Sequence, residues 1–328
     1  MRDAIFGLII GDALGVPVEF EDRQALRSNP VVDMRAYGTY MQPKGTWSDD
    51  SSMMLCLMES LTHGLDYQDQ MSRFLRWADE AYMTPHDEVF DMGVSTRKAL
   101  LAFAHGTPAL ECGATAINEN GNGSLMRILP LAFFLRSTIG KDFNQGSGAY
   151  EIIHNCPSLT HAHPISKMAC GIYCSIVNEI INLRALTPNR QNLIYTAVET
   201  GIDIAKNYYR GQEGFNEWLP RFRRVDADIL LQLKEEDVQS TGYVIYTLEA
   251  ALWCLLHTDD FKSCLLKAVN LGNDTDTVAA VTGGMAGSVY GLNALPMDWV
   301  DSIVRKDMID GLYESFEAKM EKLTQYNA

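Results

Sequence analysis

Apolar residues recur at three- and four-residue steps along most of the chain, which is the spacing of one face of an α-helix. The clearest stripe, in residues 49–62, includes Leu57 and Leu61 and is followed by a glycine that favours a helix end. A second stripe runs from Ile165 to about Leu183. The same spacing predicts five further helices, over residues 95–104, 125–135, 193–208, 243–257 and 277–290.

The predicted helix over 277–290 is unusually rich in small residues. Gly283, Gly284 and Gly287 weaken an isolated helix but let a neighbouring backbone approach closely. We therefore expect a tightly packed helix near the centre of the molecule. Strand signals are scarce, because only residues 243–246 (YVIY) have the composition of a strand. The predicted fold class is all-α.

The length of the chain, 328 residues, is sufficient for one large hydrophobic core. No internal segment has the composition of a linker, so we predict a single domain over residues 1–328. The polar stretches 137–150 and 210–240 are interpreted as surface loops or small insertions in that domain.

Acidic residues outnumber basic ones in this sequence. Asp and Glu total 42 against 27 Lys and Arg, and the resulting formal charge of -15 repels a nucleic-acid backbone. The compact basic cluster at 221–224 is followed closely by Asp226 and Asp228. We therefore expect no duplex nucleic acid as a partner, whereas a small nucleotide held by backbone amides and metal is compatible with this charge.

Cysteine usage and the first residues bear on location. Seven cysteines are scattered, mostly in apolar surroundings, and form no CxxC pair. This pattern is typical of reduced thiols, so a cytoplasmic protein is expected. The apolar run 4–10 is cut short by Asp12 and is too short to span a membrane, so no membrane association is expected.

Two acidic groups stand at the starts of predicted helices. The first reads Ser48-Asp49-Asp50, and the second reads Asn273-Asp274-Thr275-Asp276-Thr277. The first group alone is typical of a helix cap, in which one side chain accepts hydrogen bonds from free amides. The second group offers more such residues than a cap needs. If the two helix starts converge, which the sequence leaves open, their oxygens suit a pair of Mg²⁺ or Mn²⁺ ions.

Three ordered motifs resemble those of the ADP-ribosylglycohydrolase family. Residues 11–15 read GDALG and are followed by Glu19, residues 45–51 read GTWSDDS, and residues 272–277 read GNDTDT. Each motif is weak alone, but all of them in this order are highly specific, over a match from about residue 4 to about residue 300. Ser48 and Ser51 stand where family members often carry Thr, and a serine hydroxyl still coordinates a metal or caps a helix.

The resemblance implies a compact orthogonal helical bundle with a binuclear Mg²⁺ or Mn²⁺ site in a central cleft. The metal ligands that it implies are Ser48, Asp49, Asp50, Asp274, Asp276 and Thr277. It assigns catalysis to Glu19, Asp49 and Asp276, and Glu19 either moves the proton near the anomeric carbon or helps to hold one metal. By itself, Glu19 is equally typical of a surface carboxylate. Asp12 lies in an apolar segment, so a structural or supporting role is favoured.

Further residues are assigned to ADP-ribose by the same resemblance. The glycine-rich turn that would bind phosphate and ribose contains Gly121, Asn122, Gly123 and Ser124. His161 is expected to line the ADP-ribose pocket and His163 to be structural, although this segment is also typical of a loop that caps the next helix.

Two more assignments concern the ends of the pocket. Asp91 is expected to receive the guanidinium of an ADP-ribosylated arginine at the cleft entrance, although a lone Asp before a helix is most often a cap. Tyr243 is assigned to adenine or ribose contact, although an aromatic residue at the start of an apolar helix is more often part of the core.

The function implied is hydrolysis of the bond between the distal ribose of ADP-ribose and an acceptor, with an arginine-linked protein or small molecule as the first expectation. The product would be ADP-ribose. Two alternatives belong to other classes: a crystallin-like structural or ADP-ribose-binding protein on the same fold, and a metal-dependent phosphohydrolase that would release AMP or phosphate. The sequence leaves the oligomeric state open.

Overall fold

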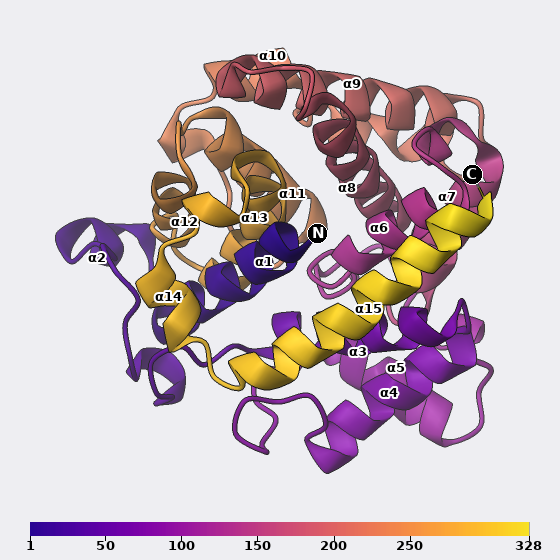
Figure 1. Cartoon of the computed structure of the whole chain (residues 1–328), viewed down its shortest axis with the longest axis horizontal. Helices are drawn as coiled ribbons and strands as arrows, with labels where there is room; N and C mark the ends of the chain where they lie inside the picture. Colours follow the sequence, from indigo (N-terminus) through magenta and orange to yellow (C-terminus); the bar gives the residue numbers. More distant parts are fainter. Residues whose placement is uncertain (328) are drawn as a thin grey trace.

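The computed structural model of the protein describes residues 1–327, which form helices joined by turns (Figure 1). Its α-helices are α1 (Arg2–Gly15), α2 (Arg23–Ser28), α3 (Asp49–His63), α4 (Tyr67–Glu80), α5 (Val94–Ala104), α6 (Leu129–Thr138), α7 (Ser147–Ser158), α8 (Pro164–Leu183), α9 (Arg190–Arg210), α10 (Ala227–Gln232), α11 (Val244–Leu256), α12 (Phe261–Val269), α13 (Thr275–Tyr290), α14 (Met297–Ser302) and α15 (Lys306–Asn327). Short 3-10 helices are η1 (Val16–Val18), η2 (Gly38–Tyr40), η3 (Ala109–Glu111), η4 (Phe143–Gln145), η5 (Asn216–Phe222), η6 (Glu235–Asp237) and η7 (Leu292–Ala294). Within residues 1–327 only isolated β-bridges accompany these helices, so the all-α prediction is confirmed.

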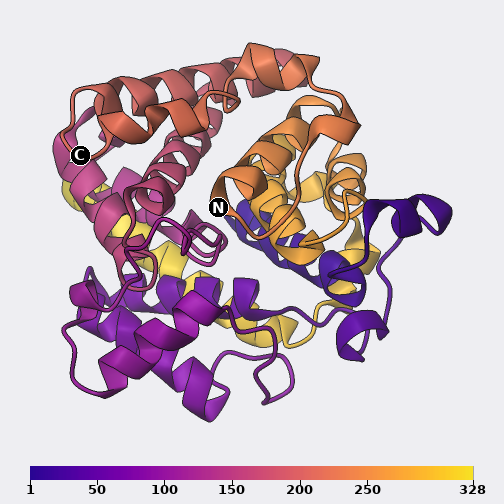
Figure 2. The same cartoon turned by 180° about the vertical axis from the view of Figure 1, so that it is seen from behind.

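Helices α1 and α13 lie side by side at the centre of the molecule (Figures 1 and 2). Every residue of α1 except Arg2 is buried, and so is every residue of α13 except Tyr290. The two backbones touch where Gly7 faces Gly283, because a Cβ on either glycine would collide with the carbonyl of the other. The predicted central helix with close backbone approach is therefore confirmed.

The other helices surround this pair. Helices α11 and α12 pack on α13, and α8 packs against α6, α7 and α9. Helix α15 runs diagonally across the face seen in Figure 1 and packs on α3 and α6. Helix α4 packs on the opposite side of α3 and carries α5 next to it.

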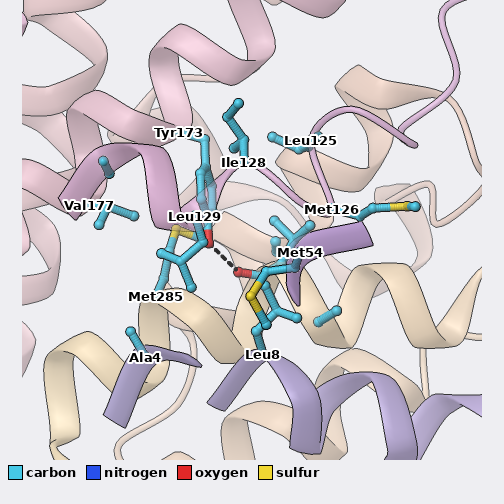
Figure 3. Packing of buried hydrophobic residues seen from close by; sticks show 14 of the residues in the cluster. Ala4, Leu8, Met54, Leu125, Met126, Ile128, Leu129, Tyr173, Val177 and Met285 are labelled. Atoms are coloured by element: carbon cyan, nitrogen blue, oxygen red, sulfur yellow. Dashed lines mark hydrogen bonds between the residues drawn. The ribbon is translucent and has the colours of Figure 1, made fainter. Parts of the chain in front are cut away.

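Side chains from α1, α3, α6, α8 and α13 meet in one hydrophobic core (Figure 3). Leu8, Met54 and Met285 are fully buried there. The buried Tyr173 hydroxyl donates to the backbone carbonyl of Val281 at 3.5 Å, which gives this polar group a partner inside the core. The core thus ties the starts of α3 and α13 to one rigid body.

Each of the seven predicted helices is present, with corrected bounds. Helix α6 begins at Leu129 rather than at 125, because residues 124–127 form turns. Residues 244–246 belong to α11, so the strand alternative for this segment is wrong. The polar stretch 210–240 contains η5, α10 and η6, and the stretch 137–150 contains η4 and the start of α7.

All seven cysteines are buried free thiols. No helix within the described residues is both long enough and apolar enough to cross a bilayer.

Candidate active site

The two acidic helix starts converge in space. The Thr277 hydroxyl in the first turn of α13 donates to Asp50 Oδ2 in the first turn of α3 at 3.2 Å. The Ser48 hydroxyl, at the N-cap of α3, lies 3.3 Å from the same oxygen. Residues separated by more than two hundred positions therefore form one cluster, which we call the acidic centre: Ser48, Asp49, Asp50, Asp274, Asp276 and Thr277.

Asp12 holds the backbone at the start of α3 in place. Its carboxylate accepts hydrogen bonds from the backbone N–H of Ser48 (2.9 Å) and from the N–H (3.0 Å) and hydroxyl of Ser51. Burial raises the pKa of Asp12 to about 6, against the lowering effect of these hydrogen bonds. Asp12 thus anchors the first turn of α3 and fixes the direction of Asp49 and Asp50.

Glu19 reaches the acidic centre through a fixed turn. The Phe20 N–H donates to the Asn273 carbonyl at 2.7 Å, and the Asn273 N–H donates to the Glu21 carbonyl at 2.8 Å. Both Phe20 and Asn273 adopt the left-handed conformation, with φ of 65° and 62°. This exchange joins the segment after α1 to the segment before α13, so Glu19 lies over Asp276.

Asp91 is part of the same group. One carboxylate oxygen each from Glu19, Asp91 and Asp276 lie within 4.8 Å of one another. Asp91 is held in the left-handed region (φ 54°), in an irregular segment that precedes α5. From sequence we expected Asp91 at the cleft entrance, and the structure brings it into contact range of the acidic centre itself.

The Tyr40 hydroxyl makes polar contacts with the carboxyls of both Glu19 and Asp91. The Tyr40 ring packs between Phe20 and Phe90, with centroid distances of 6.5 and 4.9 Å. No sequence motif points to Tyr40, because it lies in η2, outside the three motifs.

Burial dominates the electrostatics of the acidic centre. Burial and then the charge of Asp91 raise the pKa of Glu19 to about 9. The pKa of Asp276 also rises well above its ordinary value, through burial and then the charges of Glu19 and Asp50. Carboxyls this close cannot all ionise without compensating positive charge.

Around the acidic centre, four buried carboxylate oxygens have no hydrogen-bond partner among residues 1–327: Glu19 Oε2, Asp50 Oδ1, Asp274 Oδ1 and Asp276 Oδ2. Buried polar atoms are normally paired, so such a concentration is a sign of ligands for a cation. Carboxylates and hydroxyls are also the donors that Mg²⁺ and Mn²⁺ prefer. The residues present therefore fit a site for divalent cations.

A cavity of about 520 Å³ opens from the acidic centre. Glu19, Asp49, Asp91, Asp274 and Thr277 line its acidic end, whereas Ser48, Asp50 and Asp276 are buried beneath them. This volume is within the range of small-molecule sites. Carboxylates thus concentrate at one end of a ligand-sized hollow.

The glycine-rich turn also lines this cavity. Gly121, Asn122 and Gly123 line the cavity, and the Asn122 side chain donates to Asp274 Oδ2 at 2.8 Å. Ser124 is fully buried behind the turn, where its hydroxyl accepts from the Cys170 thiol. Asn122 therefore connects the turn directly to the acidic centre.

His161 supports the turn from inside the protein. Its ring packs against Gly123, and its Nδ1 lies 2.8 Å from the Thr160 hydroxyl. Burial, and then the charge of Arg127, lower the pKa of His161 to about 3, so this side chain is neutral at physiological pH. The buried Arg127 guanidinium donates to the carbonyl of Gly123 and to the Thr160 hydroxyl. His161 lines the cavity, whereas His163 caps α8.

The ends of the cavity carry residues with weaker sequence signals. Tyr243 lies in an adjoining hollow of about 440 Å³, together with Arg221, and this hollow shares Gly121 with the main cavity. Lys98 and Glu119 form an ion pair at 2.8 Å on the cavity wall. Sequence analysis missed this pair because neither residue belongs to a motif.

Comparison with known proteins agrees with the motifs. The family model of the ADP-ribosylglycohydrolases matches residues 1–325. The ADP-ribosylarginine hydrolase Tri1 of Serratia proteamaculans is 32% identical over 320 residues, which cover 95% of this chain and 77% of that protein. The ADP-ribosyl-[dinitrogen reductase] glycohydrolase of Rhodospirillum rubrum is 27% identical, over 92% of this chain and 90% of that protein.

A solved structure supports the fold. An ADP-ribosylglycohydrolase-related protein complex superposes with a TM-score of 0.75 and 28% sequence identity, over 98% of this chain and 96% of that chain. Fold, motifs and comparisons together define the class of the protein as a glycohydrolase that acts on ADP-ribosyl groups. The chain belongs to the ADP-ribosylglycohydrolase family.

Proposed function

We propose that the protein removes ADP-ribose from a modified arginine side chain by hydrolysing the bond to the distal ribose, with two Mg²⁺ or Mn²⁺ ions bound at the acidic centre. The observation that carries this proposal is the set of buried, unpartnered carboxylate oxygens at one end of a cavity of about 520 Å³. A non-enzymatic protein would have little reason to keep this charge, because buried unpaired carboxylates oppose folding.

The residues that would hold the cations are Ser48, Asp49, Asp50, Asp274, Asp276 and Thr277. When bound, the ions would neutralise these carboxylates and act as Lewis acids toward the distal ribose and water. The contribution of the protein is to fix the geometry of the ligands. Asp12 does this for α3, and Asn122 does this for Asp274.

The wall of the cavity formed by the glycine-rich turn suits the pyrophosphate and riboses. Backbone amides at a glycine-rich turn bind phosphate oxygens without adding negative charge. Neutral His161 adds a polar ring beside Gly123 and places no positive charge near the proposed cation site. The hollow around Tyr243 and Arg221 extends this wall in the direction proposed for the adenosine end.

The acceptor end is proposed at Asp91. A carboxylate there would pair with the planar guanidinium of arginine through two parallel hydrogen bonds. Relatives in Serratia proteamaculans and Pseudomonas putida, at 32% and 27% identity, are named ADP-ribosylarginine hydrolases, which supports an arginine acceptor.

Hydrolysis needs one proton to be moved near the anomeric carbon. Water adds its oxygen to that carbon, the carbon–nitrogen bond breaks, and the departing guanidine nitrogen takes up a proton. Glu19 retains a proton at neutral pH in the absence of cations, since burial and Asp91 raise its pKa to about 9. We assign this proton transfer to Glu19, while Asp49 and the other carboxylates stabilise positive charge that develops on the ribose.

Product analysis tests the proposal. The purified protein would be incubated with arginine-, serine- and nucleobase-linked ADP-ribose, each with Mg²⁺, Mn²⁺ or EDTA, and the products identified by mass spectrometry. We expect intact ADP-ribose and free arginine in the presence of metal, and none with EDTA. AMP as the first product would point to a phosphohydrolase, and unchanged turnover in EDTA would overturn the metal assignment.

A further inference from the structure

A second hollow lies directly beside the acidic cavity. It encloses about 510 Å³ between α4 and α5 and is closed by residues 89–92. Most of its lining is apolar, including Leu75, Ala78, Val89, Phe90, Met92 and Leu100. We call it the apolar pocket. None of the roles assigned above uses it.

The wall between the two hollows is a single segment of chain. Asp91 lines both hollows, and its neighbours Phe90 and Met92 line the apolar pocket. The carboxyl of Asp91 lies with Glu19 and Asp276, and the ring of Phe90 packs on Tyr40. A group held by Asp91 therefore lies beside the segment that separates the acidic cavity from the apolar pocket.

The segment that leads into this wall has polar contacts to distant parts of the chain. Glu88 accepts from Gln42 at 2.6 Å, and Asp87 pairs with Arg305 at 2.6 Å. The Arg305 side chain also donates to the Thr84 carbonyl at 3.0 Å. These contacts hold residues 84–88, which lead directly into the wall.

Part of the apolar lining of this pocket is exposed at the surface. Leu101, which lines the pocket, is 55% exposed. A single exposed apolar residue is ordinary, but this one belongs to a ligand-sized hollow. Asp79 and Arg97 supply the polar groups of the lining besides Asp91.

We propose that the apolar pocket binds a hydrophobic side chain of a protein acceptor, one or two residues from the ADP-ribosylated arginine. This inference rests on the proposed function and extends it from an arginine to a sequence context. Its basis is continuity, since the acceptor leaves the acidic centre at Asp91 and the pocket begins on the other face of the same residue. The enzyme would then prefer a polypeptide with an apolar neighbour over a free modified arginine.

Competing substrates test this preference. The panel contains free ADP-ribosylarginine and a peptide in which Gly and Ser surround an ADP-ribosylated arginine. Four further peptides each carry a single Leu, placed one or two residues before or after that arginine. We expect at least one Leu position to raise kcat/KM roughly tenfold over the all-Gly/Ser peptide, which is the effect of burying much of one apolar side chain.

Variants that fill the apolar pocket with a large side chain provide a second test of the proposal. Ala78→Trp introduces a large side chain at a half-buried position of the lining, and Ala104→Trp does so at the exposed end of α5. The first change is the more severe, so the second serves if Ala78→Trp does not fold. We expect either variant to abolish the preference for Leu and to leave turnover of free ADP-ribosylarginine unchanged. Ala185→Trp, at an exposed turn after α8, is the control and should keep the preference.

The outcomes separate the two proposals. Turnover of free ADP-ribosylarginine without any Leu preference, or a preference that survives both pocket variants, would overturn the apolar pocket and leave the proposed function standing. An absence of turnover on every arginine-linked substrate would overturn both. A Leu preference that only the pocket variants remove is the expected result.

Discussion

The protein begins its helices with acidic residues in two different ways. At the start of α4, exposed Asp66 accepts hydrogen bonds from the N–H groups of Gln68 (2.8 Å) and Asp69 (3.1 Å). At the start of α12, exposed Asp260 accepts from the Ser263 N–H at 2.8 Å. These side chains are ordinary N-caps, which satisfy free amides while they remain in contact with water.

Helix α13 begins differently. Asp274 occupies the N-cap position, yet within the part of the chain that the structure describes its side chain caps no amide and its Oδ1 has no partner. Asp276 follows in the first turn and is fully buried, and its Oδ2 also has no hydrogen-bond partner among the described residues. The same residue type at the same helix position therefore stabilises the helix in one region and opposes folding in the other. Stability alone explains the first region, whereas the second agrees with the cation site that we propose.

Among the substitutions that test this difference between helix starts, Asp276→Asn should have the largest effect on activity. The substitution keeps the shape and removes a buried charge, so the protein should fold normally, whereas hydrolysis of ADP-ribosylarginine should fall at least about a hundredfold. We expect Mn²⁺ to raise the Tm of the unmodified protein and to have no such effect on the variant. Enzyme assay and thermal unfolding with and without Mn²⁺ measure both effects.

The control for Asp276→Asn is Asp66→Asn, which changes an acid at an ordinary cap. It should keep both the activity and the response to Mn²⁺. Full activity in Asp276→Asn would mean that this carboxylate is neither a ligand nor a catalytic group, and the division between the two kinds of helix start would fail.

Most helices could be predicted from sequence because they have one apolar face. Helix α8 is an example, and its observed start at Pro164 is one residue from the predicted one. Helix α1 gave no such signal, because it is apolar nearly all round and buried on every side, which removes the helical period from its sequence. The central element of the core was therefore the hardest to identify.

The site shows the same division between local and distant information. The start of α13 could be identified because its acidic residues are adjacent in sequence. The approach of Asp91 to Glu19 could not, since it depends on backbone bonds between residues 20 and 273 and on the left-handed turn at Asp91. Tyr40 and the apolar pocket follow from tertiary packing alone. The family resemblance indicated that the starts of α3 and α13 converge. Which other residues lie beside them could be learned only from the three-dimensional structure.

The stability of the metal-free protein should depend on pH in the direction that the acidic centre dictates. Glu19 has an ordinary pKa of 4.5 and a folded-state pKa of about 9, because of burial and then Asp91. The folded state holds this proton more tightly, so the stabilisation is complete below pH 4.5 and is lost as pH rises toward 9. We expect Tm in EDTA to fall by roughly 5 °C or more between pH 5 and 8.5.

Glu19→Gln is the matched variant for the pH experiment, because it cannot lose a proton. Its Tm in EDTA should fall less steeply over the same interval, and the remaining slope reflects Asp49, Asp50 and Asp276, whose pKa values burial also raises. If the Tm of the unmodified protein in EDTA rose with pH, the predicted loss of stability on deprotonation of Glu19 would be contradicted.

The smallest effect is expected at the ordinary caps, and it has the opposite sign to the effect at the acidic centre. Asp66→Ala removes two hydrogen bonds at the start of α4 and should lower the free energy of unfolding by about 0.5–2 kcal/mol. Asp274→Ala, at the equivalent position of α13, removes a buried carboxylate and should raise the stability of the metal-free protein, even though one bond from Asn122 is lost. Urea unfolding in EDTA measures both. If Asp274→Ala destabilised the metal-free protein by as much as Asp66→Ala does, the idea that this buried carboxylate opposes folding would be contradicted.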